Sequence, residues 1–309
     1  MSRVGLTALA AALGLLACAQ LRQLPGGREL EEYAKREAQR SGEQVSRNLV
    51  HMVQSGEFSK SAAFDMEQEF WLGRSVAADV VARLGGPALP PTSPASRYLR
   101  DVGTVVAFSA AELRRPDDRP YPLKGYRFIL VDAPHVNATG CPGGFVAVTS
   151  GTLAAARSED EVAAVLAHEI AHVQLGHAMS PVEAARQQEH LTAEALRGTN
   201  PAIHAFFGTV VTAGTDFALD KGYGKSNELA ADAFAARVLA RAGYDSRALS
   251  AFLSRLSGPA AQGGFFQRHP PAAERVAALA GMGLAAPAAD PAVRLPRFQR
   301  ALASARPGH

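Results

Sequence analysis

The chain has 309 residues, of which 47% are hydrophobic, so it is long enough to bury one large core or two smaller ones. The formal net charge is only +3 and the sequence contains no long basic block, which argues against nucleic-acid binding. Cysteine occurs only at positions 18 and 141.

The N-terminus resembles the signal peptide of a bacterial lipoprotein. Arg3 precedes an apolar run, and Leu15-Leu16-Ala17-Cys18 is similar to a lipobox. The run is shorter than the roughly 18 apolar residues that a membrane-spanning helix needs. We therefore predict a signal peptide over residues 1–17 and acylation of Cys18. An uncleaved anchor or an ordinary signal peptide is the alternative.

The residue after the cysteine bears on where such a lipoprotein would reside. Ala19 stands where Asp would favour retention in the inner membrane, so we expect lipid anchoring at the periplasmic face of the outer membrane. Acylation of Cys18 would leave Cys141 without a disulfide partner. Within residues 18–63, the stretch from Glu29 to about His51 is charged and helix-prone, and we interpret this segment as a spacer or packing helix after the anchor.

Residues 64–284 read as the folded domain. Tyr126 to Asp132 and Phe145 to Thr149 have the composition of strands, which predicts a small antiparallel sheet. Asn137 and the Gly143-Gly144 pair lie between them, and a simple turn would explain both features.

The motif His168-Glu169-Ile170-Ala171-His172 follows this sheet. On a helix, a spacing of four residues places both imidazoles on the same face. There they can bind one zinc ion while the carboxylate of Glu169 acts on a metal-bound water. The pattern therefore predicts metal-assisted hydrolysis. The alternative is an ordinary amphipathic helix with two solvated histidines.

The sequence also predicts the bounds of this helix. Ser158 and Glu161 have the spacing of a capping box, in which each side chain accepts a hydrogen bond from the other residue's backbone amide. An apolar stripe follows, and Ser180-Pro181 is the expected stop. The motif should therefore lie in the middle of a largely buried helix.

Two histidines leave a catalytic zinc site one protein ligand short. A metzincin would need Gly at position 175 and His at position 178, but the chain has Leu175 and Ala178. We therefore interpret His177 as a polar or exposed helix residue outside the site.

A second helix supplies a better third ligand. We expect it to begin with Ser226 as N-cap and to end at Gly243. Glu228 and Asp232 then share one face. Glu228 can bind the metal, and Asp232 can accept the outward N–H of a ligand imidazole. A solvated helix edge is the alternative for these two carboxylates.

Two further segments have weaker patterns. Residues 178–225 are long for a plain connection between helices and are a candidate lid over the cleft. Residues 285–309 form a tail rich in Ala and Pro, which we interpret as either mobile or a short docking segment.

Several motifs together resemble one known family. They are Glu67 to Arg74, Val136-Asn137-Ala138, Pro142 to Gly151, His168 to His172, Asn227 to Asp232, Arg241 to Asp245, and His269-Pro270-Pro271 with Arg275. In this order they are similar to the gluzincin zinc metallopeptidases of the HtpX, CAAX prenyl protease and BepA type. The chain departs from the family pattern at Thr139, Gly140 and Cys141, where apolar residues are usual.

The resemblance implies a mainly helical, zincin-like α+β domain and a zinc-dependent endopeptidase. By carry-over, His168, His172 and Glu228 hold one zinc ion, Glu169 is the general base, and Asp232 orients a ligand imidazole.

Two further roles are implied only by the resemblance. Asn137 and Ala138 are candidates for the strand that pairs with an extended substrate. His269 could act as a fourth ligand that closes the site, although a helix-start motif at His269-Pro270-Pro271 is the alternative.

The family analogy indicates misfolded or mistargeted envelope proteins as substrates. A non-proteolytic assembly factor for outer-membrane proteins, stabilised by zinc, is a second possibility, although Glu169 argues against it because a structural metal site needs no base. A hydrolase for a non-protein amide such as cell-wall peptide is a third.

Overall fold

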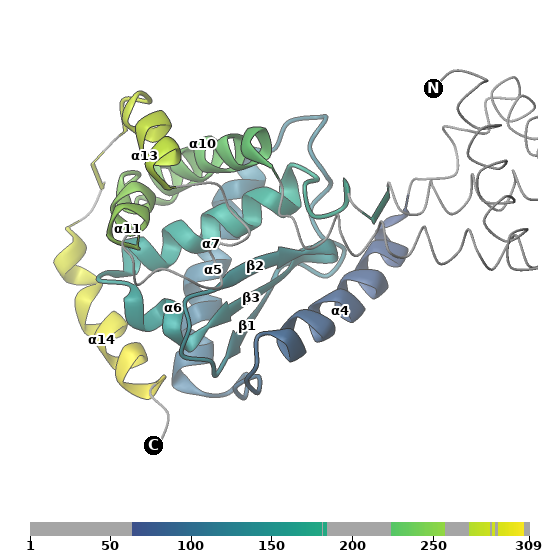
Figure 1. Ribbon diagram of the computed structural model, residues 1–309, viewed down its shortest axis with the longest axis horizontal. Coiled ribbons are helices and arrows are strands. Elements are labelled where there is room, and N and C mark those ends of the chain that lie inside the picture. Colours follow the sequence, from purple (N-terminus) through teal and green to yellow (C-terminus); the bar gives the residue numbers. More distant parts are fainter. Residues whose placement is uncertain are drawn as a thin grey trace, which may run out of the picture. The chain divides into compact units, whose positions relative to one another are not determined.

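The computed structural model describes residues 64–180, 182–183, 224–256, 272–284, 286–287 and 290–305. Apart from residues 182 and 183, these belong to one folding unit, drawn in colour in Figure 1. Its helices are α4 (Met66–Arg83), α5 (Pro94–Glu112), α6 (Ser150–Ala155), α7 (Glu159–Gln174), α10 (Lys225–Ala242), α11 (Ala248–Leu256), α13 (Ala272–Ala280) and α14 (Leu295–Ser304). Its strands are β1 (Arg127–Val131), β2 (Ala138–Cys141) and β3 (Phe145–Thr149), with the 3-10 turns η1 (Pro142–Gly144) and η3 (Pro291–Val293).

The α+β class is confirmed, and both predicted strands form, as β1 and β3. The sheet has the order β1-β3-β2. β2 pairs antiparallel with β3, but β1 pairs parallel with β3, so the sheet is mixed and the prediction of an antiparallel sheet is wrong for one pair. The parallel pair arises because β2 and η1 lie between β1 and β3 in the chain, so that the chain re-enters β3 in the direction of β1.

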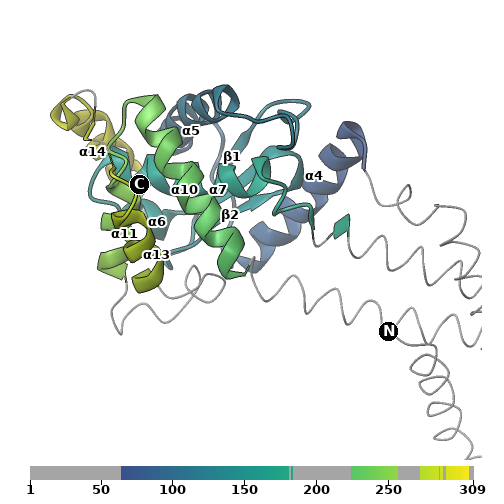
Figure 2. The same ribbon diagram turned by 90° about the horizontal axis from the view of Figure 1, so that it is seen from above.

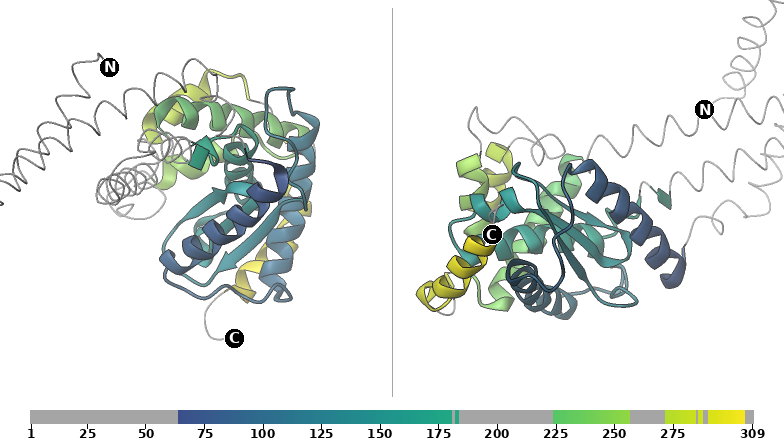
Figure 3. Two further views of the ribbon diagram at one scale, coloured as in Figure 1. Left: turned by 90° about the vertical axis from the view of Figure 1, so that its right-hand side faces the viewer. Right: turned by 90° about the horizontal axis from the view of Figure 1, so that it is seen from below.

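Both faces of the sheet are covered. Val146 and Val148 belong to the main core with α5 and α7, whereas Phe145 and Ala147 point to the side of α4. This alternation follows from the two-residue period of a strand. Figure 3 shows α4 lying along one face of the sheet.

Helix α4 approaches the sheet closely because it has a glycine at the contact. A Cβ on Gly73 would lie 1.9 Å from the Pro142 carbonyl oxygen, so only glycine fits. Gly143 has a φ of 67°, a left-handed conformation that glycine adopts without strain. The buried Glu69 carboxylate accepts a hydrogen bond from the Gly143 amide at 3.1 Å, which ties α4 to η1.

Helix α7 carries the HExxH motif and lies in the core of this folding unit. All 16 of its residues are buried, and α5 and α10 pack against it. Figure 2 shows α10 crossing beside α7. Ser158 caps α7 by accepting from the Glu161 amide, as predicted. The reciprocal half of the capping box is wrong, because the Glu161 carboxylate accepts from the Arg157 amide instead.

The C-terminal end of α7 also differs from the prediction. The helix ends at Gln174 and not near Pro181, because the chain turns at Gly176, whose φ is +81°. The amide of Ala178 then donates back to the His172 carbonyl at 3.1 Å. His177 therefore lies on a turn beneath the helix and not on its surface.

Three acidic residues in the first turn of α7 each pair with an arginine from later in the chain. The pairs are Glu159–Arg297, Asp160–Arg294 and Glu161–Arg255. Carboxylates at a helix N-terminus also complement the helix dipole. The two pairs made by Arg294 and Arg297 join the N-terminal end of α14 to the start of α7.

Candidate metal centre

His168, His172 and Glu228 converge in the core, and each is fully buried. The two histidines come from consecutive turns of α7, and Glu228 comes from the first turn of α10. One ligand atom from each lies within 4.8 Å of the others. The Nε2 atoms of the two histidines are 3.1 Å apart, and each is 3.4 Å from an oxygen of Glu228. Three donors thus face one point from two separate helices.

The position at which α10 begins determines that the carboxylates of Glu228 and Asp232 face α7. The helix begins at Lys225 with Gly224 as N-cap, so the prediction of Ser226 as N-cap is wrong by two residues. The stop at Gly243 is confirmed, since this residue is left-handed with a φ of 79°. Glu228 and Asp232, one turn apart, both reach the buried side of the helix.

Asp232 contacts the far nitrogen of His168. Its Oδ1 lies 2.9 Å from His168 Nδ1, opposite the Nε2 atom that faces Glu228. Arg275 of α13 grips Asp232 with two hydrogen bonds, of 2.6 and 2.8 Å. From the sequence, Arg275 is identified only as part of the family motif at His269-Pro270-Pro271, and its contact with Asp232 was not predicted. No local pattern could have indicated it, because 43 residues separate the two.

The electrostatics of this group favour positive charge. Burial and the Arg275 cation oppose protonation of His168, but hydrogen bonds with Asp232 and Glu228 outweigh them and raise its pKa to about 9. Burial alone would raise the pKa of Asp232, but Arg275 and His168 lower it. The carboxylates therefore create a site that attracts a cation.

His177 is a residue that sequence reasoning placed wrongly. It is only 9% exposed, and its Nδ1 lies 3.0 Å from Nδ1 of His172. Burial lowers the pKa of His177. Gly176 could have predicted that α7 ends before His177, since glycine often follows the last turn of a helix.

Glu169 is buried beside the cluster. Its Oε2 accepts a hydrogen bond of 2.7 Å from the Gly140 amide on β2, while its Oε1 has no hydrogen-bond partner among the described residues. A Cβ on Gly140 would lie 2.5 Å from the Glu169 carbonyl oxygen. The departure from the family pattern at Gly140 therefore lets β2 pack directly against the backbone of α7.

Asn137 and Ala138 lie at the start of β2, next to the edge of the sheet. Asn137 is buried, and its backbone amide donates to the hydroxyls of Thr149 and Thr152. Its side-chain oxygen has no partner within the described part of the chain. Two other predicted site residues, Cys18 and His269, lie outside the described residues.

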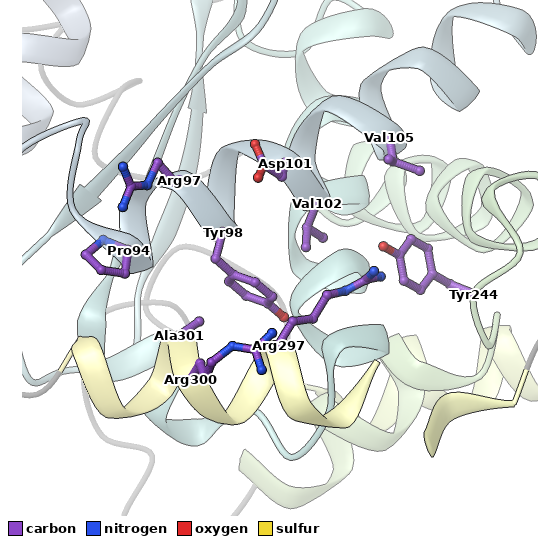
Figure 4. Close-up of a pocket in the computed structure, with 10 residues that line it drawn as sticks. All are labelled: Pro94, Arg97, Tyr98, Asp101, Val102, Val105, Tyr244, Arg297, Arg300 and Ala301. Carbon is purple, nitrogen blue, oxygen red and sulfur yellow. The ribbon is translucent and has the colours of Figure 1, made fainter. Parts of the chain in front are cut away.

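A cavity of about 450 Å³ lies elsewhere, between α5 and α14 (Figure 4). Tyr98, Tyr244 and Arg297 are among its lining residues, but none of the clustered histidines and carboxylates lines it. Arg297 is already paired with Glu159. The cavity thus contributes nothing to the cluster around His168.

Fold and site together define a zincin-like metallopeptidase, with the HExxH helix beside a small sheet and a glutamate supplied by a second helix. The chain belongs to peptidase family M48, since residues 96–282 match that family. M48 peptidases are zinc metalloproteases.

Three bacterial relatives are similar to the chain over about half its length. A putative beta-barrel assembly-enhancing protease of Vibrio cholerae is 31% identical over 167 residues, which cover 52% of this chain and 33% of the relative. Beta-barrel assembly-enhancing proteases of Yersinia pestis and Escherichia coli strain K12 are 29% and 27% identical, over 52% of this chain and 32% of each relative. The chain therefore spans about a third of the length of these relatives.

Proposed function

We propose that the chain is a zinc-dependent endopeptidase in which His168, His172 and Glu228 hold the metal ion and Glu169 is the general base. The convergence of the three donor atoms within 4.8 Å of one another is the observation that carries this proposal. Membership of a zinc metalloprotease family supports it.

The donor set fits zinc by its chemistry. Two imidazole nitrogens and one carboxylate oxygen are the ligands of many catalytic zinc sites, which keep a further position for water. His168 and Glu228 are completely buried, and Arg275 Nη1, 3.5 Å from Glu228 Oε2, offsets part of the cost of burying this carboxylate. Asp232 and Arg275 would fix the orientation of the His168 ring.

When bound, zinc supplies a Lewis acid that acidifies a water and polarises the substrate carbonyl. In the proposed mechanism, Glu169 takes the proton of the attacking water and passes it to the leaving amine. The Gly140 amide holds one Glu169 oxygen, so that Oε1 is the oxygen free to take the proton. Asn137 and Ala138 would align an extended peptide along the edge of β2 by main-chain hydrogen bonds.

We place this activity at the cell envelope and assign misfolded or mistargeted outer-membrane proteins as substrates. The names of the relatives and the lipobox-like segment ending at Cys18 support this. Within the described ranges, no helix has both the length and the apolar composition needed to cross a membrane. His269, as a fourth ligand, would close the resting site.

Cleavage of an unfolded protein by pure enzyme tests the proposal. Wild type should digest casein, lose activity with a chelator and regain it with zinc. Glu169→Gln should keep one zinc per chain but lose cleavage by a factor of at least about 100, because proton transfer by a positioned side chain contributes about 100- to 10,000-fold. The exposed Glu67→Gln is the matched control and should retain full activity.

An assembly factor with a purely structural zinc is the alternative function. Intact zinc binding with no proteolysis in wild type would favour it, and so would equal cleavage by wild type and Glu169→Gln. Release of peptidoglycan fragments without casein digestion would instead indicate a cell-wall amidase.

A further inference from the structure

The two histidines of the HExxH motif have different neighbours on their outward sides. His168 Nδ1 contacts the Asp232 carboxylate, which Arg275 holds in place. His172 Nδ1 contacts another imidazole, His177, at 3.0 Å. The His172 and His177 rings lie 5.1 Å apart with an interplanar angle of 62°, an edge-on arrangement.

We propose that His177 is a positioning residue for the metal centre, whose Nδ1 accepts a hydrogen bond from Nδ1 of His172. The inference rests on the proposed function, because it assigns a role to the surroundings of one metal ligand.

The chemistry of imidazole leads to this assignment. A neutral ring carries one proton, and a nitrogen that binds a metal ion must offer its lone pair. In His172 the Nε2 atom faces His168 and Glu228, so the proton belongs on Nδ1. That N–H needs an acceptor, because a buried donor without one costs about 1–3 kcal/mol.

His177 offers an acceptor, since its Nδ1 lies 3.0 Å from Nδ1 of His172. To accept, its Nδ1 must carry the lone pair, which leaves its own proton on Nε2. The turn at Gly176 and the hydrogen bond from the Ala178 amide to the His172 carbonyl keep the two rings together. The sequence His172-Val173-Gln174-Leu175-Gly176-His177 thus supplies both the ligand and its support.

Two substitutions separate hydrogen bonding from packing. His177→Phe retains a ring but removes the acceptor. His177→Asn shortens the side chain but keeps an oxygen on Cγ, where the histidine has Nδ1, so it can accept the same hydrogen bond. His135→Phe is the matched control, because His135 is exposed and its side chain is not part of the cluster.

The test measures zinc affinity by competition with a chromophoric chelator, together with the melting temperature of the metal-free proteins. His177→Phe should weaken zinc binding about 10- to 100-fold, the usual loss when the hydrogen-bond partner of a ligand histidine is removed. His177→Asn should stay within about threefold of wild type and restore most of kcat/KM.

Two outcomes would overturn the inference. One is an unchanged zinc affinity in His177→Phe. The other is equal loss in His177→Phe and His177→Asn when both metal-free proteins melt like wild type. Failure of the proposed function would be recognised separately, because wild type itself would then bind no zinc or would bind zinc without cleaving casein.

Discussion

Gly176 determines where His177 lies. Its φ of +81° is left-handed, which costs a residue with a Cβ about 1–2 kcal/mol. Space is not the constraint, because an added Cβ would come no closer than 3.5 Å to Arg119. The turn that brings His177 beneath His172 therefore depends on backbone conformation alone.

Gly176→Ala should accordingly weaken zinc binding towards the level of His177→Phe and lower the melting temperature by a few degrees. Gly281→Ala is the control, since Gly281 has no left-handed φ and a Cβ there would be 3.5 Å from its nearest neighbour. Chelator competition and thermal melts on both variants provide the measurement. A normal zinc affinity in Gly176→Ala would show that the turn does not position His177.

At the same scale, the sequence predicted the cluster better than its surroundings. The four-residue spacing of His168 and His172 is a property of any helix, so their common face could be predicted. The contacts of His177 and Arg275 depend on where α7 stops and on how α13 packs against α10. The periodicity of apolar residues in the sequence predicts neither the end of α7 nor the packing of α13 against α10.

Among the elements, α11 illustrates how a turn is fixed before a helix. Asp245 precedes α11 and accepts hydrogen bonds of 2.9 Å from the backbone amide and the guanidinium of Arg247. Its own amide donates to Asp160 at the start of α7. Burial alone would raise the pKa of Asp245, but the hydrogen bonds from Arg247 outweigh it and lower this pKa below its usual range.

This lowered pKa predicts a pH-dependent contribution to stability. Folding favours the charged form of Asp245, so its contribution is present above the unfolded pKa of about 3.9 and is lost as the pH falls through the lower folded pKa. Asp245→Asn should therefore melt below wild type at pH 7, and the two curves should converge below about pH 4. Melting temperatures recorded from pH 3 to pH 8 test this, and a constant difference across that range would contradict it.

Element types were easier to predict than element ends. Strand composition predicted β1 and β3, and the capping serine predicted the start of α7. The parallel pairing of β1 with β3 was missed because composition does not reveal connectivity. The N-cap of α10 was misplaced because Gly224 replaces the side-chain cap with a positive φ of 78°.

On the scale of the whole molecule, three arginines pair with the acidic residues at the N-terminus of α7. They are Arg255 of α11, Arg294 and Arg297. The pairs differ in burial. The side chains of Arg294 and Asp160 are 10% and 5% exposed, whereas Arg297 is 51% exposed although its partner Glu159 is fully buried.

Removal of a buried partner leaves a buried charge uncompensated, which costs about 3–5 kcal/mol. Arg294→Ala should therefore reduce the free energy of unfolding by about 3 kcal/mol. Arg297→Ala also leaves a buried carboxylate without its cation, so it too should cost more than the control, although solvent already screens the half-exposed arginine. Urea unfolding of both, with Arg83→Ala at an exposed pair as control, measures the difference. An Arg294→Ala loss no larger than the control value would refute this ranking.

The ion pairs between the start of α7 and the α14 region join parts of the chain that are synthesised far apart in time. Glu159 and Arg297 are 138 positions apart, and Asp160 and Arg294 are 134 apart. A nascent chain therefore contains His168 and His172 long before it contains these arginines. Until they have been synthesised, Glu159 and Asp160 lack these cationic partners at the start of α7, so this part of the fold is completed only when the C-terminal helix is present.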